Sequence, residues 1–266
     1  MKITIYIFFL LNAAGLCAQD YETLIALSFE YVQAENLNAA KQVLIEALRL
    51  EPANARNVLL LSNLGTLQRQ TGENKDALLS YTAALSRAPT STSILANRAR
   101  LFVELNQAQD AIMDYTMLLQ LLPHDNETYY QRGLLYLQTK NIEAAQADFE
   151  HLLAANENTL QGRLGMAKVA IFRNEYEDAE KIYYFLIEKL PQLSDLYVGR
   201  AELYLLMGKN AAALRDVNKA MSLKEKDKED PDAYLYELRA LCKEQIFEYK
   251  DAEKDREQAN KIKNLQ

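Results

Sequence analysis

Proline recurs along this chain at a fixed interval, and that interval limits the folds the chain can adopt. Pro89 and Pro123 lie 34 residues apart, Pro191 follows after twice that distance, and Glu157 occupies the intermediate position. Pro52 lies 37 residues before Pro89 and comes close to the series. A period of 34 residues is typical of stacked helix–turn–helix repeats, each of which buries its apolar face against its neighbours. The spacing therefore predicts an all-α solenoid.

Seven repeats can be aligned on this period. They cover residues 21–54, 58–91, 92–125, 126–159, 160–193, 194–227 and 233–266. A small residue recurs near the middle of the first predicted helix, at Ser28, Gly65, Ala99, Gly133, Ala167, Ala201 and Ala240. An alanine recurs early in the second, at Ala40, Ala77, Ala111, Ala145, Ala179, Ala213 and Ala252. Four residues later a bulky side chain fills the space in six repeats, at Leu44, Tyr81, Tyr115, Phe149, Tyr183 and Val217. Alternating small and bulky residues lets two helices pack closely.

In these positions the chain resembles tetratricopeptide repeat proteins over essentially all of residues 21–266. The small residues, the bulky residue and the terminal proline recur together in register. The resemblance implies a right-handed superhelical solenoid of about seven repeats, whose first helices line a concave groove. It also implies protein binding, because the family includes chaperone adaptors, secretion components, assembly scaffolds and regulators. The fold alone does not identify the binding partner.

Two repeats depart from the pattern. The first helix of the fifth repeat carries Gly162 and Gly165, which are poor helix formers, and we expect it to be the least rigid part of the solenoid. The seventh repeat has Arg256 where the others have a bulky apolar residue, and residues 250–263 are almost entirely charged, amide or small. We interpret this polar stretch as a C-terminal cap, because the outer face of a terminal repeat meets water.

The N-terminus has the layout of a secretory signal peptide. Lys2 precedes an apolar run over residues 3–11, and mostly small residues follow as far as Ala18. We predict a signal peptide over residues 1–18 and a solenoid over residues 19–266, in the periplasm or secreted, with association with the outer membrane as a further possibility. A lipid anchor at Cys17 is the alternative, but Leu16 stands where lipoprotein processing wants a small residue. No later apolar run is long enough for a transmembrane helix.

Charge and cysteine content narrow the function further. Removing residues 1–18 leaves 29 basic and 37 acidic residues, a formal charge of −8. An acidic solenoid does not suit general binding of nucleic acid or of anionic lipid. Cys242 is the one cysteine left after cleavage, so the fold cannot depend on an internal disulfide, and we interpret this thiol as a small buried apolar group.

An arginine and an aspartate occur together, sixteen residues apart, in four repeats. The pairs are Arg98 with Asp114, Arg132 with Asp148, Arg200 with Asp216, and Arg239 with Asp255. The other three repeats have neither member of the pair at these positions. We therefore predict four structural ion pairs within repeats, bidentate where they are buried.

The candidate binding site lies on the predicted groove. Asn63, Asn97 and Gln131 occupy equivalent positions in three successive first helices, where their amides could bind a peptide backbone. The alternative is that these three amides are solvated or form hydrogen bonds between helices. Large side chains and a lysine accompany them: Tyr130, Leu134, Leu164, Lys168 and Phe172. Exposed apolar residues in a groove favour a binding site, and we expect about half of the apolar groove residues to pack between neighbouring helices instead.

Residues that would indicate catalysis or cofactor binding are not grouped in this sequence. His124 and His151 have no neighbours at metal-ligand spacing, and we find neither a phosphate-binding glycine loop nor a hydrolase motif. The sequence therefore predicts a protein without a cofactor or metal. We expect a non-enzymatic adaptor of the cell envelope that binds a peptide segment or a partner helix in its groove. The alternative is a permanent structural subunit, or a self-associating assembly factor, of an envelope complex.

Overall fold

The computed structural model of the chain describes residues 20–264, and the predicted signal peptide and Cys17 lie outside them. Within that range the secondary structure consists of fourteen α-helices without strands. The helices are α1 (Tyr21–Gln33), α2 (Leu37–Leu50), α3 (Asn57–Gln70), α4 (Asn74–Arg87), α5 (Thr92–Glu104), α6 (Ala108–Leu121), α7 (Asn126–Gln138), α8 (Ile142–Ala155), α9 (Leu160–Phe172), α10 (Tyr176–Lys189), α11 (Ser194–Leu206), α12 (Asn210–Lys226), α13 (Ala233–Glu244) and α14 (Tyr249–Lys263). The predicted all-α repeat fold is confirmed.

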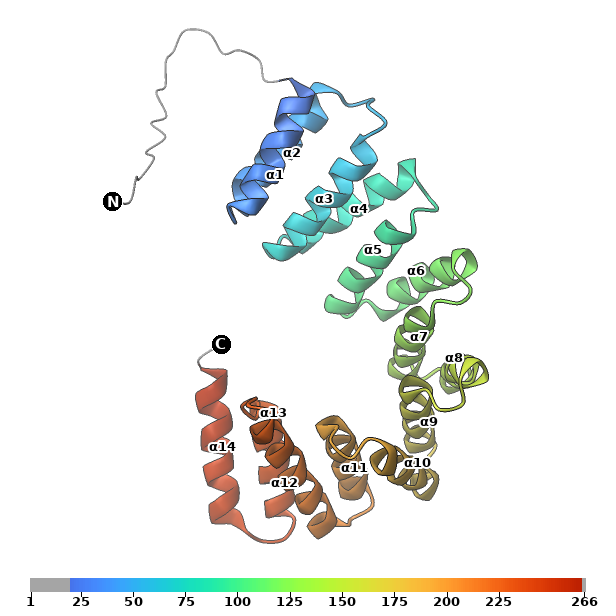
Figure 1. Cartoon of the computed structure of the whole chain (residues 1–266), viewed down its shortest axis with the longest axis vertical. Helices are drawn as coiled ribbons and strands as arrows, with labels where there is room; N and C mark the ends of the chain where they lie inside the picture. The colour runs from blue at the N-terminus through green and yellow to red at the C-terminus, as the bar shows by residue number, and fades with distance from the viewer. Residues whose placement is uncertain (1–19, 265–266) are drawn as a thin grey trace, which may run out of the picture. The chain divides into compact units, whose positions relative to one another are not determined.

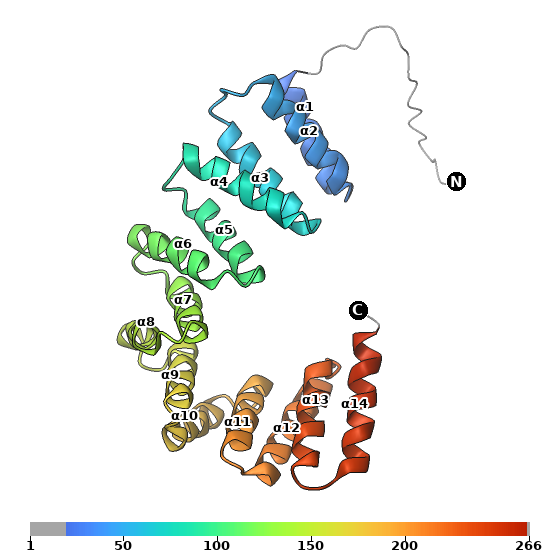
Figure 2. The same ribbon diagram turned by 180° about the vertical axis from the view of Figure 1, so that it is seen from behind.

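The helices form two compact units, an N-terminal one that ends at Gln107 and a C-terminal one that begins at Ala108. Within each unit, every helix packs beside the helix before it in sequence (Figures 1 and 2). The boundary falls between α5 and α6, inside the third repeat. None of the helices described is long and apolar enough to cross a membrane.

Side-chain caps and left-handed turns set the helix ends. Aspartate or asparagine side chains accept a hydrogen bond from the third residue beyond them at the starts of five helices, at Asp20, Asn36, Asp125, Asn141 and Asp232. Between the two helices of each repeat one residue has positive φ, at Glu35, Gly72, Asn106, Lys140, Asn174, Gly208 and Phe247. The next amide then bonds back to the carbonyl five residues before it, for example from Lys209 to the carbonyl of Tyr204 at 2.8 Å, which closes a Schellman turn.

Phe247 is the one aromatic residue among these seven turn positions. Its φ is 70°, its side chain is 78% exposed, and its ring meets Tyr249 edge-on at 6.2 Å between ring centroids. A left-handed conformation costs an ordinary L-residue about 1–2 kcal/mol, and glycine avoids most of that cost. The turn of the seventh repeat is therefore strained.

We predict that Phe247→Gly raises the free energy of unfolding by about 0.5–1 kcal/mol, since relief of the left-handed strain exceeds the extra entropy of an unfolded glycine. Urea denaturation followed by circular dichroism measures the change. Gln245→Gly is the matched control in the same turn, and its φ of −65° leaves glycine nothing to relieve, so it should destabilise. A loss of stability in both variants would show that contacts of the ring outweigh the strain.

The core repeats the pattern seen in sequence. The early alanine of every second helix is at most 1% exposed, and the bulky residues four positions later are at most 5% exposed. Repeat seven differs as expected, because Arg256 is exposed and pairs with Glu244. Cys242 is a free, fully buried thiol, and burial raises its pKa to about 11, so it stays protonated within the core.

The first helix of the fifth repeat packs closely at its glycines, and its lower rigidity stays a prediction. The segment around Gly162 and Gly165 forms part of the continuous helix α9, and both glycines are buried. A methyl group at Gly165 would lie 2.2 Å from the ring of Phe149, and one at Gly133 would lie 2.6 Å from the same ring. Phe149 is fully buried, so its ring is wedged between the first helices of repeats four and five. These glycines allow close approach, a role that helix propensity alone did not reveal.

Candidate functional site

Three of the four arginine–aspartate pairs lie within the C-terminal unit, and each is bidentate. Arg132 donates to Asp148 at 2.9 and 2.6 Å, and Arg200 donates to Asp216 at 2.7 and 2.9 Å. Arg239 holds Asp255 in the same way, at 2.9 and 2.5 Å. The remaining pair has one member in each unit, Arg98 and Asp114, and it stays a prediction. The aspartates are all buried, so these pairs belong to the repeat core.

The arginines also reach the preceding repeat, which the sequence did not indicate. Arg132 donates to the hydroxyl of Thr116 on α6 at 3.1 Å, and Arg98 donates to the hydroxyl of Thr82 on α4 at 3.1 Å. Each threonine lies sixteen residues before its arginine, just as the aspartate lies sixteen residues after it. One guanidinium of this kind can therefore connect the second helices of two consecutive repeats.

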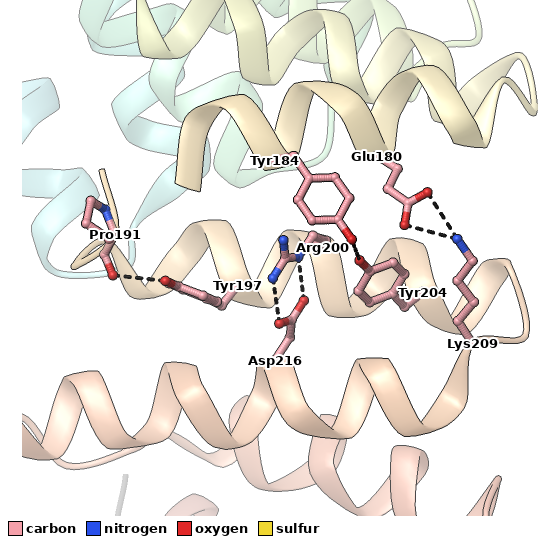
Figure 3. A network of polar contacts seen from close by, with 8 residues as sticks. All are labelled: Glu180, Tyr184, Pro191, Tyr197, Arg200, Tyr204, Lys209 and Asp216. Atoms are coloured by element: carbon pink, nitrogen blue, oxygen red, sulfur yellow. Dashed lines mark hydrogen bonds and ion pairs between the residues drawn. The ribbon is translucent and has the colours of Figure 1, made fainter. Parts of the chain in front are cut away.

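At Arg200 the same position of the preceding repeat carries an aromatic ring. The guanidinium carbon lies 4.8 Å from the ring centroid of Tyr184 on α10, while its nitrogens hold Asp216 on α12 (Figure 3). Tyr184 and Tyr204 share a hydrogen bond of 3.0 Å between their hydroxyls, and Lys209 donates to Glu180 at 3.0 Å (Figure 3). Charge-assisted and cation–π contacts thus join α10, α11 and α12.

Asp255 has a second cation beside its arginine. Lys243 donates to the same carboxylate at 2.7 Å. Burial alone would raise the pKa of Asp255, but the hydrogen bonds from Arg239 and Lys243 hold that pKa below its ordinary value. This carboxylate therefore contributes stability that is present above the unfolded pKa and is lost as the pH falls through the folded one.

The three amides of the predicted series are half-buried and already hydrogen-bonded in part. The oxygen of Asn97 accepts from Arg100 at 3.2 Å, and the amide of Gln131 donates to Glu127 at 2.7 Å. Asn63 lines a hollow of about 240 Å³ beside Phe29 and Val32 in the N-terminal unit. Gln131 belongs to the other unit, so the series as a whole stays a prediction.

Three of the other five predicted groove residues line one pocket in the C-terminal unit. It has a volume of about 330 Å³ and is lined from α7, α9, α10 and α11 by Leu134, Leu137, Gln138, Lys168, Ile171, Phe172, Tyr183, Glu202, Leu203 and Leu206. Leu134, Lys168 and Phe172 had been predicted as site residues. Tyr130 and Leu164 do not line it, and they pack, as Leu134 also does, against the core clusters. Six of the eight apolar residues on the groove face of repeats four to six are half-buried, and Phe172 and Leu206 are exposed; the six are Tyr130, Leu134, Leu164, Ile171, Val198 and Leu205.

Phe172 and Leu206 give the pocket an apolar mouth. They are 46% and 56% exposed, although each is a large apolar side chain on a first helix. Lys168 and Glu202 supply one charge of each sign, on α9 and α11. Glu202 accepts a hydrogen bond from Tyr234 on α13. A concave apolar site with few polar groups suits a side chain of a partner.

Sequence reasoning missed Tyr183 and Glu202 as pocket residues. Tyr183 had been assigned only as the bulky residue of its repeat, and Glu202 had no assigned role. The signal that could have found Glu202 is its position, because it lies on the same first-helix face as Val198 and Leu205. Among the residues described, no group of three or more histidine, cysteine or acidic side chains could hold a metal ion.

Comparison with known proteins places the chain among repeat proteins of this type. The family model for the tetratricopeptide repeat matches residues 21–54 and 127–159. A tetratricopeptide repeat protein from Parabacteroides merdae ATCC 43184 is 41% identical, with a TM-score of 0.82 over 91% of this chain and 93% of that one. No curated protein matches the sequence.

More distant structures share the fold alone. PilW, described as a widely conserved type IV pilus biogenesis factor, is 17% identical, with a TM-score of 0.60 over 76% of this chain and 91% of its own. YrrB, described as a tetratricopeptide repeat protein with an unusual peptide-binding site, is 16% identical, with a TM-score of 0.50 over 68% of this chain and 92% of its own.

Proposed function

The chain belongs to the tetratricopeptide repeat family, and on that premise we propose that it is a non-enzymatic scaffold that binds a segment of a partner protein on its first helices. The observation that carries the proposal is the pocket between α7, α9 and α11. Phe172 and Leu206 are exposed at its mouth, where water solvates them poorly, and a partner side chain would bury both. The peptide-binding site of YrrB supports the proposal to the extent that the same fold can host such a site.

We place this scaffold in the cell envelope, as an exported protein. The support is the sequence of residues 1–18, with a basic start, an apolar run and a small-residue end. An adaptor of this kind gains from rigid repeats, because a preformed pocket lowers the entropy cost of ordering the partner segment.

The test is a crosslinked pull-down of the full-length protein from the envelope fraction of its own host. Phe172→Ser with Leu206→Ser should lose the partner, because the mouth of the pocket becomes polar. Leu122→Ser with Leu190→Ser is the matched control, since both leucines are exposed in the same unit and neither lines the pocket. Retention of the same partners by both double variants would place the binding site elsewhere.

A second variant examines the amide series. Asn63, Asn97 and Gln131 are all changed to alanine, which leaves the pocket intact. A partner lost from this variant as well would show that these amides belong to the binding surface. Light scattering separates the structural-subunit alternative, because an adaptor with a free binding surface should be a monomer and a self-associating subunit should not.

A further inference from the structure

The hydroxyl of Tyr183 differs in its hydrogen bonding from that of its counterpart in the second repeat. Tyr81 occupies the same repeat position, and its hydroxyl is hydrogen-bonded to Thr66 at 3.0 Å. In the fifth repeat the position of that threonine is held by Lys168. Across residues 20–264, no hydrogen bond is formed by the hydroxyl of Tyr183, although its side chain is only 3% exposed. Where Lys168 replaces the threonine, the hydroxyl of Tyr183 therefore has no hydrogen-bond partner among the described residues.

This hydroxyl is available to a guest, because Tyr183 lines the pocket. Burial, followed by the charge of Glu202, raises the pKa of the phenol, so it stays neutral and keeps its proton to donate. A methyl group at Gly199 would meet the hydroxyl oxygen at 2.5 Å, so glycine at that position leaves room for it. The hydroxyl oxygen is open to the pocket, so an acceptor on a guest can take the place of water as its hydrogen-bond partner.

The two charges of the pocket lie on different walls and differ in what they already contact. Lys168, on α9, forms no ion pair with any residue of the described range. Glu202, on α11, accepts a hydrogen bond from the hydroxyl of Tyr234 and forms no ion pair with a residue of the described range. An apolar pocket between a cation and an anion is complementary to a segment whose own charges have the opposite order.

We infer that the occupant of this pocket is a partner segment with one large aliphatic or aromatic side chain, an acidic residue on the side of Lys168 and a basic residue on the side of Glu202. The apolar side chain enters between Phe172 and Leu206, and Tyr183 donates a hydrogen bond to a carbonyl or carboxylate oxygen of the segment. This inference rests on the proposed function and names the chemistry of the partner at the same site. It also gives the bound segment a single direction along α9 to α11.

The test uses a phage-displayed library of linear twelve-residue peptides panned on the intact protein. We expect enriched peptides to carry a large apolar residue with an acid on one side and a base on the other. Binding of a synthetic enriched peptide, measured by fluorescence anisotropy, should weaken about tenfold in Lys168→Glu and in Glu202→Lys, because each variant places like charges together. Tyr183→Phe should weaken it roughly threefold through loss of one hydrogen bond.

The controls separate this inference from the proposal on which it rests. Lys219→Glu makes the same charge change on an exposed lysine of the C-terminal unit outside the pocket, and it should bind the peptide unchanged. A peptide with its two charges exchanged should regain affinity for the Lys168→Glu, Glu202→Lys double variant. Enrichment of apolar peptides without a charge order would overturn the inference and leave the binding scaffold standing. Failure to enrich any peptide that depends on Phe172 would overturn both.

Discussion

Gly165→Ala should lower the free energy of unfolding by about 1–3 kcal/mol, against the usual effect of replacing a helical glycine by alanine. At an open helical position that change stabilises by about 1 kcal/mol. At Gly165 the added methyl would lie 2.2 Å from the ring of Phe149, which is fully buried. The ring is also confined by Gly133 on its other side, so it cannot move away without shifting α7 or α9. Overpacking of this kind strains the core.

Denaturation in urea measures the loss, and a double variant identifies its cause. Phe149→Leu shortens the wedge and is itself destabilising, because it leaves a cavity. If the clash is the cause, Gly165→Ala should cost much less in the Phe149→Leu background than in the wild-type chain, and the two changes should not add. Strict additivity would contradict the wedge, as would a Gly165→Ala variant that is more stable than the wild type.

Asp148→Asn should lower the free energy of unfolding by about 3 kcal/mol. The side chains of Arg132 and Asp148 are 15% and 5% exposed, and two hydrogen bonds join them. Asparagine has nearly the same shape but no charge, so the substitution leaves a guanidinium in the core without its counter-ion. Calorimetry gives the fall in melting temperature. An unchanged melting temperature would mean that the pair is no more than a surface contact.

The seventh repeat supplies an internal comparison for the same pair. Arg239→Met leaves Asp255 in contact with Lys243, whereas Arg132→Met removes the one ion-pair partner of Asp148 seen in the C-terminal unit. We therefore expect Arg132→Met to be the more damaging of the two. Equal losses would indicate that the packing of the arginine stem, and not the charge, carries the effect.

Much of this fold could be predicted from the repeat period. Small and bulky residues such as Ala145 and Phe149 recur at fixed positions because each repeat packs its two helices in the same way. The recurrence is therefore visible in the sequence. The pairing of Arg132 with Asp148 was equally accessible, since both residues belong to one repeat. Contacts between repeats were harder to predict. The packing of Phe149 against Gly165 and the contact of Arg132 with Thr116 depend on how one repeat sits on the next.

The candidate site illustrates the same limit. Leu134, Lys168 and Phe172 were predicted because they are large or charged on the exposed face of a first helix. Tyr130 and Leu164 satisfy the same criterion, yet they do not line the pocket. Tyr183 was counted as core, and its ring is indeed buried. In the second repeat the equivalent hydroxyl, on Tyr81, is hydrogen-bonded to Thr66. The fifth repeat has Lys168 in place of that threonine, and only a comparison of the two repeats shows why the hydroxyl of Tyr183 lacks a partner.

The junctions between repeats of the C-terminal unit are held by two different forces. Arg132 contacts repeat three from repeat four, and Arg200 contacts repeat five from repeat six. Between repeats four and five, Met166 stands in place of the arginine, and the ring of Phe149 packs between the two first helices. Cold weakens the burial of apolar surface, whereas the two arginines contact a neutral hydroxyl and a neutral ring, and such contacts do not depend on apolar burial alone. No single stress therefore loosens all of these junctions together. The pocket draws its walls from repeats four, five and six, so it should keep its shape when salt or temperature changes.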